Sequence, residues 1–168
     1  MLYERVVEVS ERLNEKGEVV TKLNEEEVRN SLIKAKSDGI NSVAIAFMHS
    51  YINPDHENKI EKIAKEENFN QISVSHKVSP LIKLVGRGDT TVVDAYLSPI
   101  LRRYVNQVSE ELKDTKSTQL MFMQSNGGLT DANLFQGKDA LLSGPAGGVV
   151  SMTQTLSLIH ISEPTRHL

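Results

Sequence analysis

The sequence predicts an α/β fold in which a mixed or parallel sheet is flanked by helices. The main observation is the run 42–48, which is apolar, rich in β-formers and bounded by turns, as expected of a fully buried parallel strand. A second predicted strand at 71–75 follows a helical pattern, so the order helix, strand, helix, strand indicates parallel βαβ units. Two glycine-rich segments, 123–128 and 142–148, each come after an apolar run and before a helical pattern.

Composition excludes several classes of protein. The chain has 168 residues and a formal net charge of −3, so it lacks the basic footprint of a nucleic-acid-binding protein. The absence of cysteine excludes disulfides, thiol catalysis and zinc–thiolate sites. No apolar run is long enough to span a bilayer, and the first residues carry no signal-peptide pattern. We therefore expect a cytoplasmic protein with neither a nucleic-acid nor a membrane partner.

The N-terminal part is predicted to form a hairpin and then a helix. Apolar runs at 6–9 and 18–21 flank residues 14–17, whose composition is that of a hairpin turn. Asn24 is the predicted N-cap of the helix, since three glutamates follow it where negative charge suits the helix dipole. Gly39 is predicted to end the helix as its C′ residue.

The middle of the chain has helical patterns. One helix is predicted over 54–68, between the two strands. A helical stretch that opens at 79–80 is predicted to break at 86–88, with Asp89 capping the next helix and Pro99 restarting it. The apolar positions expected to face inward along this long pattern are Val93, Leu97, Ile100, Leu101, Tyr104, Val105, Val108 and Leu112.

The C-terminal part is predicted to alternate strands and helices around the glycine-rich segments. We expect a strand over 119–123, a short helix over 130–135, a short strand over 140–142 and a small-residue helix over 147–155. Each glycine-rich segment is then a turn from strand to helix.

Such a turn lets backbone approach a ligand closely, and a helix N-terminus favours anions. The predicted nucleotide-contacting residues are Asn126, Gly127, Gly128, Ser143, Gly144, Gly147 and Gly148. Neither segment is a P-loop, because no Gly-Lys-Ser/Thr follows, and neither has the Rossmann spacing. The alternative is that these glycines serve only tight turns or close helix packing.

A polar segment between apolar helical stretches offers a second candidate site. Arg87, with Asp89 and Thr90 close to it, could contact an anion or a substrate. The alternative is a connection between helices in which Asp89 is a cap and Arg87 is solvated.

Two histidines near a strand-to-helix loop raise the possibility of a metal site. His49 and His56 lie near Asp55 and Glu57, but the ordered spacing of a metal motif is missing. Carboxylates are also expected in the first turn of a helix because of its dipole. We therefore predict no metal ligands here.

Several segments together resemble the hydantoinase A/5-oxoprolinase family. They are residues 43–57, residues 86–99 and both glycine-rich segments, in the same order along the chain. The run 135–140 resembles most the ATP-dependent 5-oxoprolinase branch of the family. The resemblance covers residues 1–155.

The resemblance implies an actin-like (ribonuclease H-like) ATPase fold. It implies an enzyme that uses ATP and a divalent metal such as Mg²⁺ to open a cyclic amide, for example 5-oxo-L-proline to L-glutamate. It also implies a hydantoinase B-type subunit or domain as a partner. By analogy with that fold, 143–148 resembles the connecting helix at the hinge between lobes, and 126–128 a loop that faces the cleft. Catalytic residues are not identified.

The resemblance also implies a domain division. Residues 1–115 resemble the C-terminal part of the family's N-terminal domain, and 116–155 resemble the start of the hydantoinase A domain. In the actin-like fold two Asp-x-Gly-Gly-Thr-type hairpins hold the phosphates, and neither occurs in this sequence. We therefore expect an internal fragment that is inactive alone. The alternatives are an N-methylhydantoinase, an acetone carboxylase subunit, or a non-enzymatic actin-like scaffold.

The last residues follow a different pattern. Residues 156–166 resemble the translation of a common transposase-type sequencing adapter. We predict that 156–168 is an artefact tail, and source DNA that differs from the adapter at these codons would contradict this.

Overall fold

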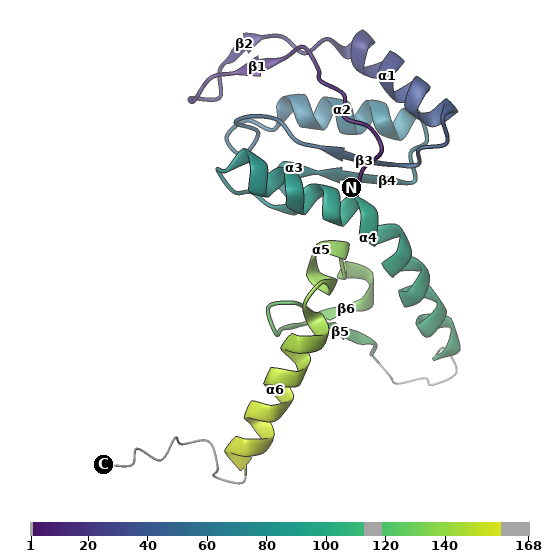
Figure 1. The fold of residues 1–168 in the computed structure, drawn as a ribbon, viewed down its shortest axis with the longest axis vertical. Coiled ribbons are helices and arrows are strands. Elements are labelled where there is room, and N and C mark those ends of the chain that lie inside the picture. The colour runs from purple at the N-terminus through teal and green to yellow at the C-terminus, as the bar shows by residue number, and fades with distance from the viewer. Residues whose placement is uncertain (1, 113–118, 159–168) are drawn as a thin grey trace. The chain divides into compact units, whose positions relative to one another are not determined.

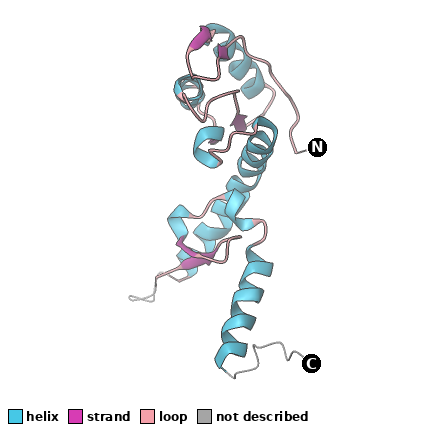
Figure 2. Ribbon diagram, turned by 90° about the vertical axis from the view of Figure 1, so that its left-hand side faces the viewer, coloured by secondary structure: helices cyan, strands magenta, loops and turns pink. Residues whose placement is uncertain are grey.

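The computed structural model describes residues 2–112 and 119–158, which belong to two compact units, Met1–Arg103 and Tyr104–Leu168. Figure 1 traces the chain, and Figure 2 colours its helices and strands. Within the described ranges, no helix combines the length and the apolarity that crossing a membrane requires.

The first unit begins with the predicted hairpin. Strand β1 (Arg12–Leu13) pairs antiparallel with β2 (Val19–Thr21), and Gly17 supplies the positive φ of +79° that the turn needs. The prediction of a strand at 6–9 is wrong. A short turn pairs the residues next to it, so the ladder forms at 12–13 and leaves 6–9 without a strand partner.

Helix α1 (Glu25–Ser37) confirms the predicted capping. The side chain of Asn24 accepts a hydrogen bond from the backbone N–H of Glu27 at 3.2 Å. At the other end Gly39 adopts φ +88°, the left-handed conformation that glycine allows after a helix.

The βαβ unit is also confirmed. Strand β3 (Ser42–Ile45) pairs in parallel with β4 (Gln71–Val74), and helix α2 (Asp55–Glu66) connects them. Figure 1 shows the strand pair between α2 on one side and the first part of α4 on the other. The buried apolar core lies between α1, α2 and the strands, and consists of Val28, Leu32, Ile45, Ile60, Ile63, Ala64, Phe69 and Val74.

After β4 come a short helix, α3 (Ser75–Val78), and a long one, α4 (Leu84–Glu111). The predicted break at 86–88, the cap at Asp89 and the restart at Pro99 are wrong, because α4 runs through all of them. Interior glycine and proline disfavour a helix by about 1 and 3 kcal/mol, but tertiary packing overrides such preferences. The packing is visible in the buried residues Arg87, Thr91, Asp94, Ala95 and Ser98, which recur every three or four positions and so share one face.

The buried face of α4 is therefore more polar than its apolar pattern predicts. Ile100 and Tyr104, expected to face inward, are 54% and 57% exposed, whereas Val105 is buried as expected. In the first unit the face meets serines of β4 and α3, so hydrogen-bonding side chains suit it better than aliphatic ones.

The second unit pairs β5 (Met121–Met123) with β6 (Leu129–Asp131) in an antiparallel hairpin. A 3₁₀ turn η1 (Ala132–Leu134), helix α5 (Gly137–Ala140) and helix α6 (Ser143–Leu158) follow. The strand over 119–123 is confirmed in part. The helix predicted over 130–135 is a strand end and a 3₁₀ turn, and the strand predicted over 140–142 is wrong, because α5 and a turn occupy it.

The glycine-rich segments consequently differ from the predicted strand-to-helix turns. Residues 126–128 lie in the hairpin turn between β5 and β6, and residues 143–148 lie within the first turns of α6. A β-hairpin is a more local solution for an Asn-Gly turn than a crossover to a helix. The predicted artefact tail lies mostly outside the described residues and stays a prediction.

Candidate functional site

A buried polar cluster lies where β3 and β4 end. It consists of Glu57 on α2, Ser50 in the loop after β3, Ser75 and His76 on α3, and Arg87 on α4. The carboxyl ends of neighbouring parallel strands meet at one edge, and ligands of open α/β folds bind in the crevice there. We call these five residues the carboxyl-edge cluster.

Glu57 is at the centre of the cluster and is completely buried. Its Oε1 accepts hydrogen bonds from the Phe47 backbone N–H at 2.9 Å and from the Ser75 hydroxyl at 2.6 Å. Its Oε2 accepts from the backbone N–H of His76 at 3.1 Å and from Nδ1 of the same residue at 2.7 Å. Four donors therefore compensate a carboxylate that water does not reach.

Arg87 is also completely buried, and each guanidinium nitrogen has a partner. Nε donates to the Ser75 hydroxyl at 2.9 Å, Nη1 to the Leu81 carbonyl at 2.6 Å, and Nη2 to the Phe47 carbonyl. The guanidinium carbon lies 5.6 Å from the centre of the Tyr51 ring, within the range of a cation–π contact. The predicted alternative of a solvated Arg87 is therefore wrong.

The two buried charges hold the loop between β3 and α2. Phe47 receives a hydrogen bond at its carbonyl from Arg87 and gives one from its N–H to Glu57. The hydroxyl of Ser50 donates to the same carbonyl at 3.0 Å and lies 3.2 Å from the Ser75 hydroxyl. The two peptide groups that flank Phe47 are thereby both hydrogen-bonded, so the loop after β3 starts from a defined position.

A second buried polar group joins β4 to α4. Gln71 donates to the Ser73 hydroxyl at 2.9 Å, Ser73 donates to Asp94 at 2.7 Å, and Ser98 donates to the other oxygen of Asp94 at 3.1 Å. The oxygen of the Gln71 amide is buried without a hydrogen-bond partner. These contacts orient α4 against the strand pair.

The hairpin is tied to α2 by a third buried contact. His56 Nδ1 lies 2.7 Å from a carboxylate oxygen of Glu11, and both side chains are almost fully buried. His56 is therefore engaged with the residue directly before β1. The described residues contain no group of three or more histidine, aspartate or glutamate side chains placed to hold a metal ion.

The outer face of α2 carries ion pairs that are largely exposed. Burial raises the pKa of Glu61, but hydrogen bonds from Lys65 and Lys77 outweigh it and hold that pKa below its usual value. Arg29 bonds both Glu66 and Glu67, and these contacts raise the pKa of its guanidinium. Exposed pairs of this kind contribute little to stability. Within 61–67 only the charged side chains form this outer face, because Ile63 and Ala64 are buried in the core.

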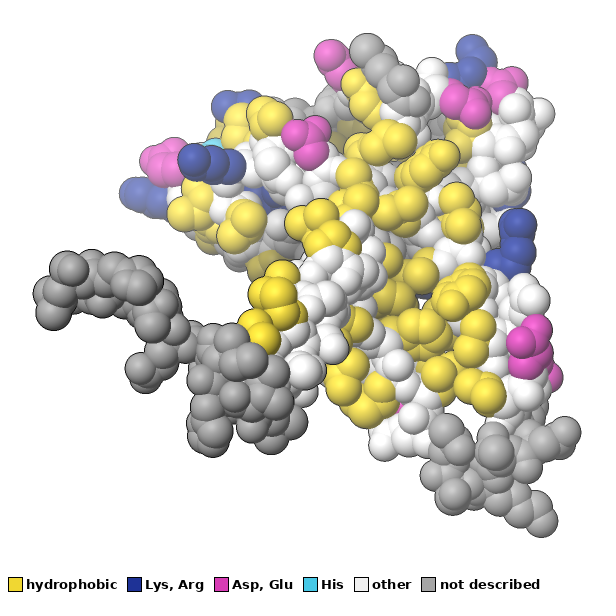
Figure 3. Space-filling view, turned by 60° about the horizontal axis from the view of Figure 1, so that its bottom comes forward, with side chains coloured by type: hydrophobic (Ala, Val, Ile, Leu, Met, Phe, Trp, Pro, Cys, Tyr) yellow, Lys and Arg dark blue, Asp and Glu magenta, His cyan; other side chains and the backbone are white. Residues whose placement is uncertain are grey.

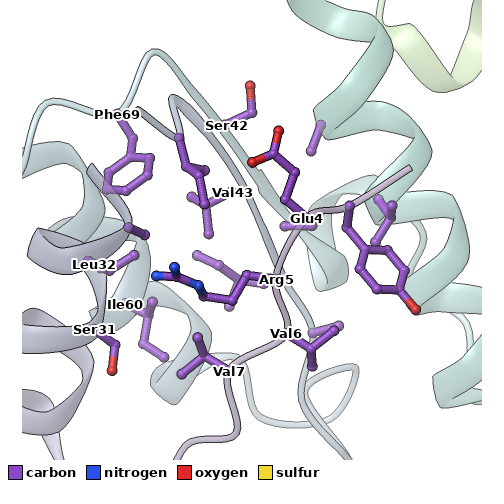
Figure 4. A pocket seen from close by; sticks show the side chains of 18 of the residues that line it. Glu4, Arg5, Val6, Val7, Ser31, Leu32, Ser42, Val43, Ile60 and Phe69 are labelled. Carbon is purple, nitrogen blue, oxygen red and sulfur yellow. The ribbon is translucent and has the colours of Figure 1, made fainter. Parts of the chain in front are cut away.

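A largely apolar groove of about 680 Å³ lies beside the core of the first unit. Figure 4 shows Val6 and Val7 of the N-terminal segment on one side of it and Leu32, Val43 and Ile60 on the other. Arg5, which also lines it, is paired with Asp38. Its lining also includes polar residues such as Ser31 and Asn41. Residues 2–8 stay exposed beside the groove, whereas Val9 packs against the core.

In the second unit the two glycine-rich segments meet. The N–H and hydroxyl of Ser125 donate to the Asp139 carbonyl at 2.7 and 2.6 Å, and the Leu142 N–H donates to the Ser125 hydroxyl at 3.0 Å. Gly127 has φ +83°, and a Cβ there would lie 3.2 Å from Val150 of α6. Gly127 is thus required by the packing of the hairpin against α6.

The other predicted nucleotide-contacting residues have different environments. Asn126 accepts a hydrogen bond from the Gly128 N–H at 2.8 Å, which closes the turn. A Cβ on Gly147 would meet Met123 at 3.6 Å, whereas nothing lies within 4 Å of one on Gly144 or Gly148. The open positions leave room for a ligand, and nucleotide contact by these residues stays a prediction.

The predicted substrate residues are not grouped around an open site. Arg87 is buried, Asp89 is exposed one turn into α4, and the Thr90 hydroxyl donates to the Gly86 carbonyl at 2.8 Å. Substrate contact by these three residues stays a prediction. The sequence analysis missed the buried role of Glu57, because the helix dipole alone explains a carboxylate in the first turn of a helix. No pattern in one sequence distinguishes it from the exposed Asp55 two residues before.

Family models match two parts of this chain. The model described as hydantoinase/oxoprolinase N-terminal region matches residues 1–68, and the one described as hydantoinase/oxoprolinase matches residues 87–163. The 5-oxoprolinase of Saccharomyces cerevisiae is 45% identical over 137 residues, covering 82% of this chain. The chain spans only 11% of the length of that relative.

Two solved structures share the fold over most of this chain. An ATP-dependent caprolactamase from Pseudomonas jessenii has a TM-score of 0.81 and 26% identity, over 90% of this chain and 22% of that one. A nucleotide-free acetone carboxylase has the same TM-score and coverage at 23% identity, which shows a shared fold. The predicted α/β class is thereby confirmed, and the domain division at 115/116 stays a prediction.

Proposed function

Because the chain belongs to the hydantoinase/oxoprolinase family, we propose that the complete protein is an ATP-dependent hydrolase that opens a cyclic amide. The substrate that the relatives favour is 5-oxo-L-proline, with L-glutamate as the product. The observation that carries this proposal is the 45% identity to a 5-oxoprolinase over most of the chain.

The chemistry explains the requirement for ATP. An amide carbonyl is a poor electrophile, and transfer of the γ-phosphoryl group from ATP to its oxygen makes the carbon open to attack by water. The reaction consumes one ATP and two waters for each ring opened, and it releases L-glutamate, ADP and phosphate. A divalent metal such as Mg²⁺ supplies charge neutralisation for phosphoryl transfer when it is bound.

The two units have different roles in this proposal. Nucleotide contact is assigned to the glycine-rich segments of the second unit, in an actin-like ATPase fold. The carboxyl-edge cluster of the first unit holds the loop after β3 in a fixed conformation. A hydantoinase B-type subunit or domain is the proposed protein partner.

The test is turnover by the complete protein. We expect release of ADP that depends on 5-oxo-L-proline, with one L-glutamate formed for each ADP. ATP turnover only with a hydantoin would indicate a hydantoinase. ATP turnover only with acetone and bicarbonate would indicate an acetone carboxylase. The absence of ATP turnover with every compound would favour a non-enzymatic scaffold.

A second substrate class has its own support. The likeness to an ATP-dependent caprolactamase favours larger lactams, because 90% of this chain matches the structure of that enzyme at 26% identity. Side-by-side rates with 5-oxo-L-proline and caprolactam at equal concentration decide between the two.

A further inference from the structure

The loop after β3 carries His49, which combines a positive φ with a buried ring nitrogen that has no hydrogen-bond partner. His49 lies four residues beyond the end of β3, at the strand edge that the carboxyl-edge cluster supports. Ligand sites in open α/β folds are formed by such loops. Phe47 and Ser50, on either side of His49, are fixed by buried partners.

The backbone of His49 is in a conformation that disfavours side chains. Its φ is +62°, and among the described non-glycine residues only Asn68 shares a positive φ. Asn68 directly follows the C-terminal end of α2, where asparagine commonly takes this conformation, but His49 follows a strand. Non-glycine residues held in this region cluster at active sites and ligand clamps.

The ring of His49 is also incompletely bonded. Nδ1 is buried and has no hydrogen-bond partner, one of two such side-chain atoms within the described residues. The centre of the Tyr51 ring lies 6.1 Å from that of the imidazole, and Tyr51 itself contacts Arg87. A buried polar atom without a partner is destabilising, so packing alone gives no reason for it.

This geometry selects a tautomer. A neutral imidazole has a single N–H, and a buried N–H without an acceptor is rarer than an unpaired acceptor. We infer the tautomer from the packing: the lone pair of Nδ1 points inward and the proton is on Nε2. His49 then offers one N–H donor from a rigid loop.

We propose that His49 is a ligand-contacting residue that donates a hydrogen bond from Nε2 to an oxygen of the substrate that gains negative charge during the reaction. This inference rests on the proposed function. An N–H donor on a loop that buried partners hold stabilises such an oxygen more in the transition state than in the ground state. Two oxygens fit the chemistry, the carbonyl oxygen of the cyclic amide and the γ-phosphoryl oxygens of ATP.

The first experiment replaces His49 in the complete protein. His49→Asn and His49→Gly both tolerate the positive φ, so neither strains the loop. We expect kcat to fall about a hundredfold, as for other lost oxyanion donors, with little change in KM or melting temperature. Asn68→Gly is the matched control at the other positive-φ residue and should keep the wild-type kcat. Retention of wild-type kcat by both His49 variants would overturn the proposal.

The second experiment does not depend on turnover. Diethylpyrocarbonate modifies accessible imidazoles, and peptide mass spectrometry measures the rate at each histidine. We expect His49 to react about tenfold more slowly when ligand is present at roughly ten times its Kd. His56, which Glu11 holds, is the internal control and should react slowly in every sample.

The ligand arms distinguish the two oxygens. Protection by 5-oxo-L-proline alone assigns the contact to the amide, and protection by a non-hydrolysable ATP analogue with Mg²⁺ assigns it to the phosphoryl group. Equal reactivity of His49 with each ligand alone and with both together overturns the proposal. A wild-type protein that hydrolyses no cyclic amide refutes the proposed function, and the nucleotide arm alone then decides for or against His49.

Discussion

Glu57 and Arg87, two completely buried charges on different helices, are joined through the hydroxyl of Ser75. The hydroxyl donates to Glu57 at 2.6 Å and accepts from Arg87 at 2.9 Å. Both charged groups also bond the backbone of Phe47: Glu57 accepts from its N–H, and Arg87 donates to its carbonyl. The arrangement links α2, α3 and α4 to the loop after β3.

Glu57→Gln should destabilise the chain strongly. The amide of glutamine places an NH2 group against two of the donors that the carboxylate accepts from, and each buried donor left unpaired costs about 1–3 kcal/mol. Urea unfolding followed by circular dichroism measures the loss. Glu66→Gln, on the exposed face of α2, is the matched control and should change stability by less than about 1 kcal/mol. Equal effects of the two substitutions would contradict the central place of Glu57.

Arg87→Lys should also be destabilising, although it keeps the charge. An ammonium group cannot reach the Ser75 hydroxyl and the carbonyls of Leu81 and Phe47 at once with the geometry of the planar fork. Each buried acceptor left unpaired costs about 1–3 kcal/mol. Arg102→Lys, at an exposed position of the same helix, should be neutral in the same urea series. A neutral Arg87→Lys would show that the fork is not needed.

The contribution of Glu61 should depend on pH. The folded-state pKa of this carboxyl lies below its ordinary value, so its stabilising effect is present above the unfolded-state pKa and is lost as pH falls through the folded one. The stability difference between wild type and Glu61→Gln should therefore be largest near neutral pH and shrink below about pH 4. A difference that grows on acidification would reverse the assigned direction.

Two glycines of the second unit should respond in opposite ways. Gly127→Ala places a Cβ at a positive φ and 3.2 Å from Val150, which should cost about 1–2 kcal/mol. A Cβ on residue 144 of α6 would meet no atom within 4 Å. Gly144→Ala should therefore stabilise the helix by up to about 1 kcal/mol, because alanine has the higher helix propensity. Hydrogen exchange of the amides in β5 and β6 measures both. Equal protection in the two variants would contradict the packing described for Gly127.

Much of the first unit could be predicted from the sequence, because local chemistry determines it. Asn24 caps α1 and Gly39 ends it, as the side-chain and backbone preferences of these residues require. The apolar run after Gly39 forms the parallel strand, although β3 ends at Ile45 and not at residue 48. The family that the resemblance indicates is also confirmed, because several segments carry it in the same order along the chain.

The errors have a common physical cause, which is packing between distant segments. Gly86, Gly88 and Pro99 predict helix ends, but the polar face that α4 packs against the strands keeps it continuous. Glu57 looks like any first-turn carboxylate until Ser75 and His76, brought beside it by the fold, fill its lone pairs. The Asn-Gly pair at 126–127 could have been assigned to a hairpin from its own turn preference.

The most direct test of the proposed activity is the stoichiometry of the reaction that the complete protein catalyses. We predict that purified protein with Mg²⁺ and ATP converts 5-oxo-L-proline to L-glutamate and forms one ADP for each ring opened. ADP release at the same rate with and without 5-oxo-L-proline, and no L-glutamate, would contradict it.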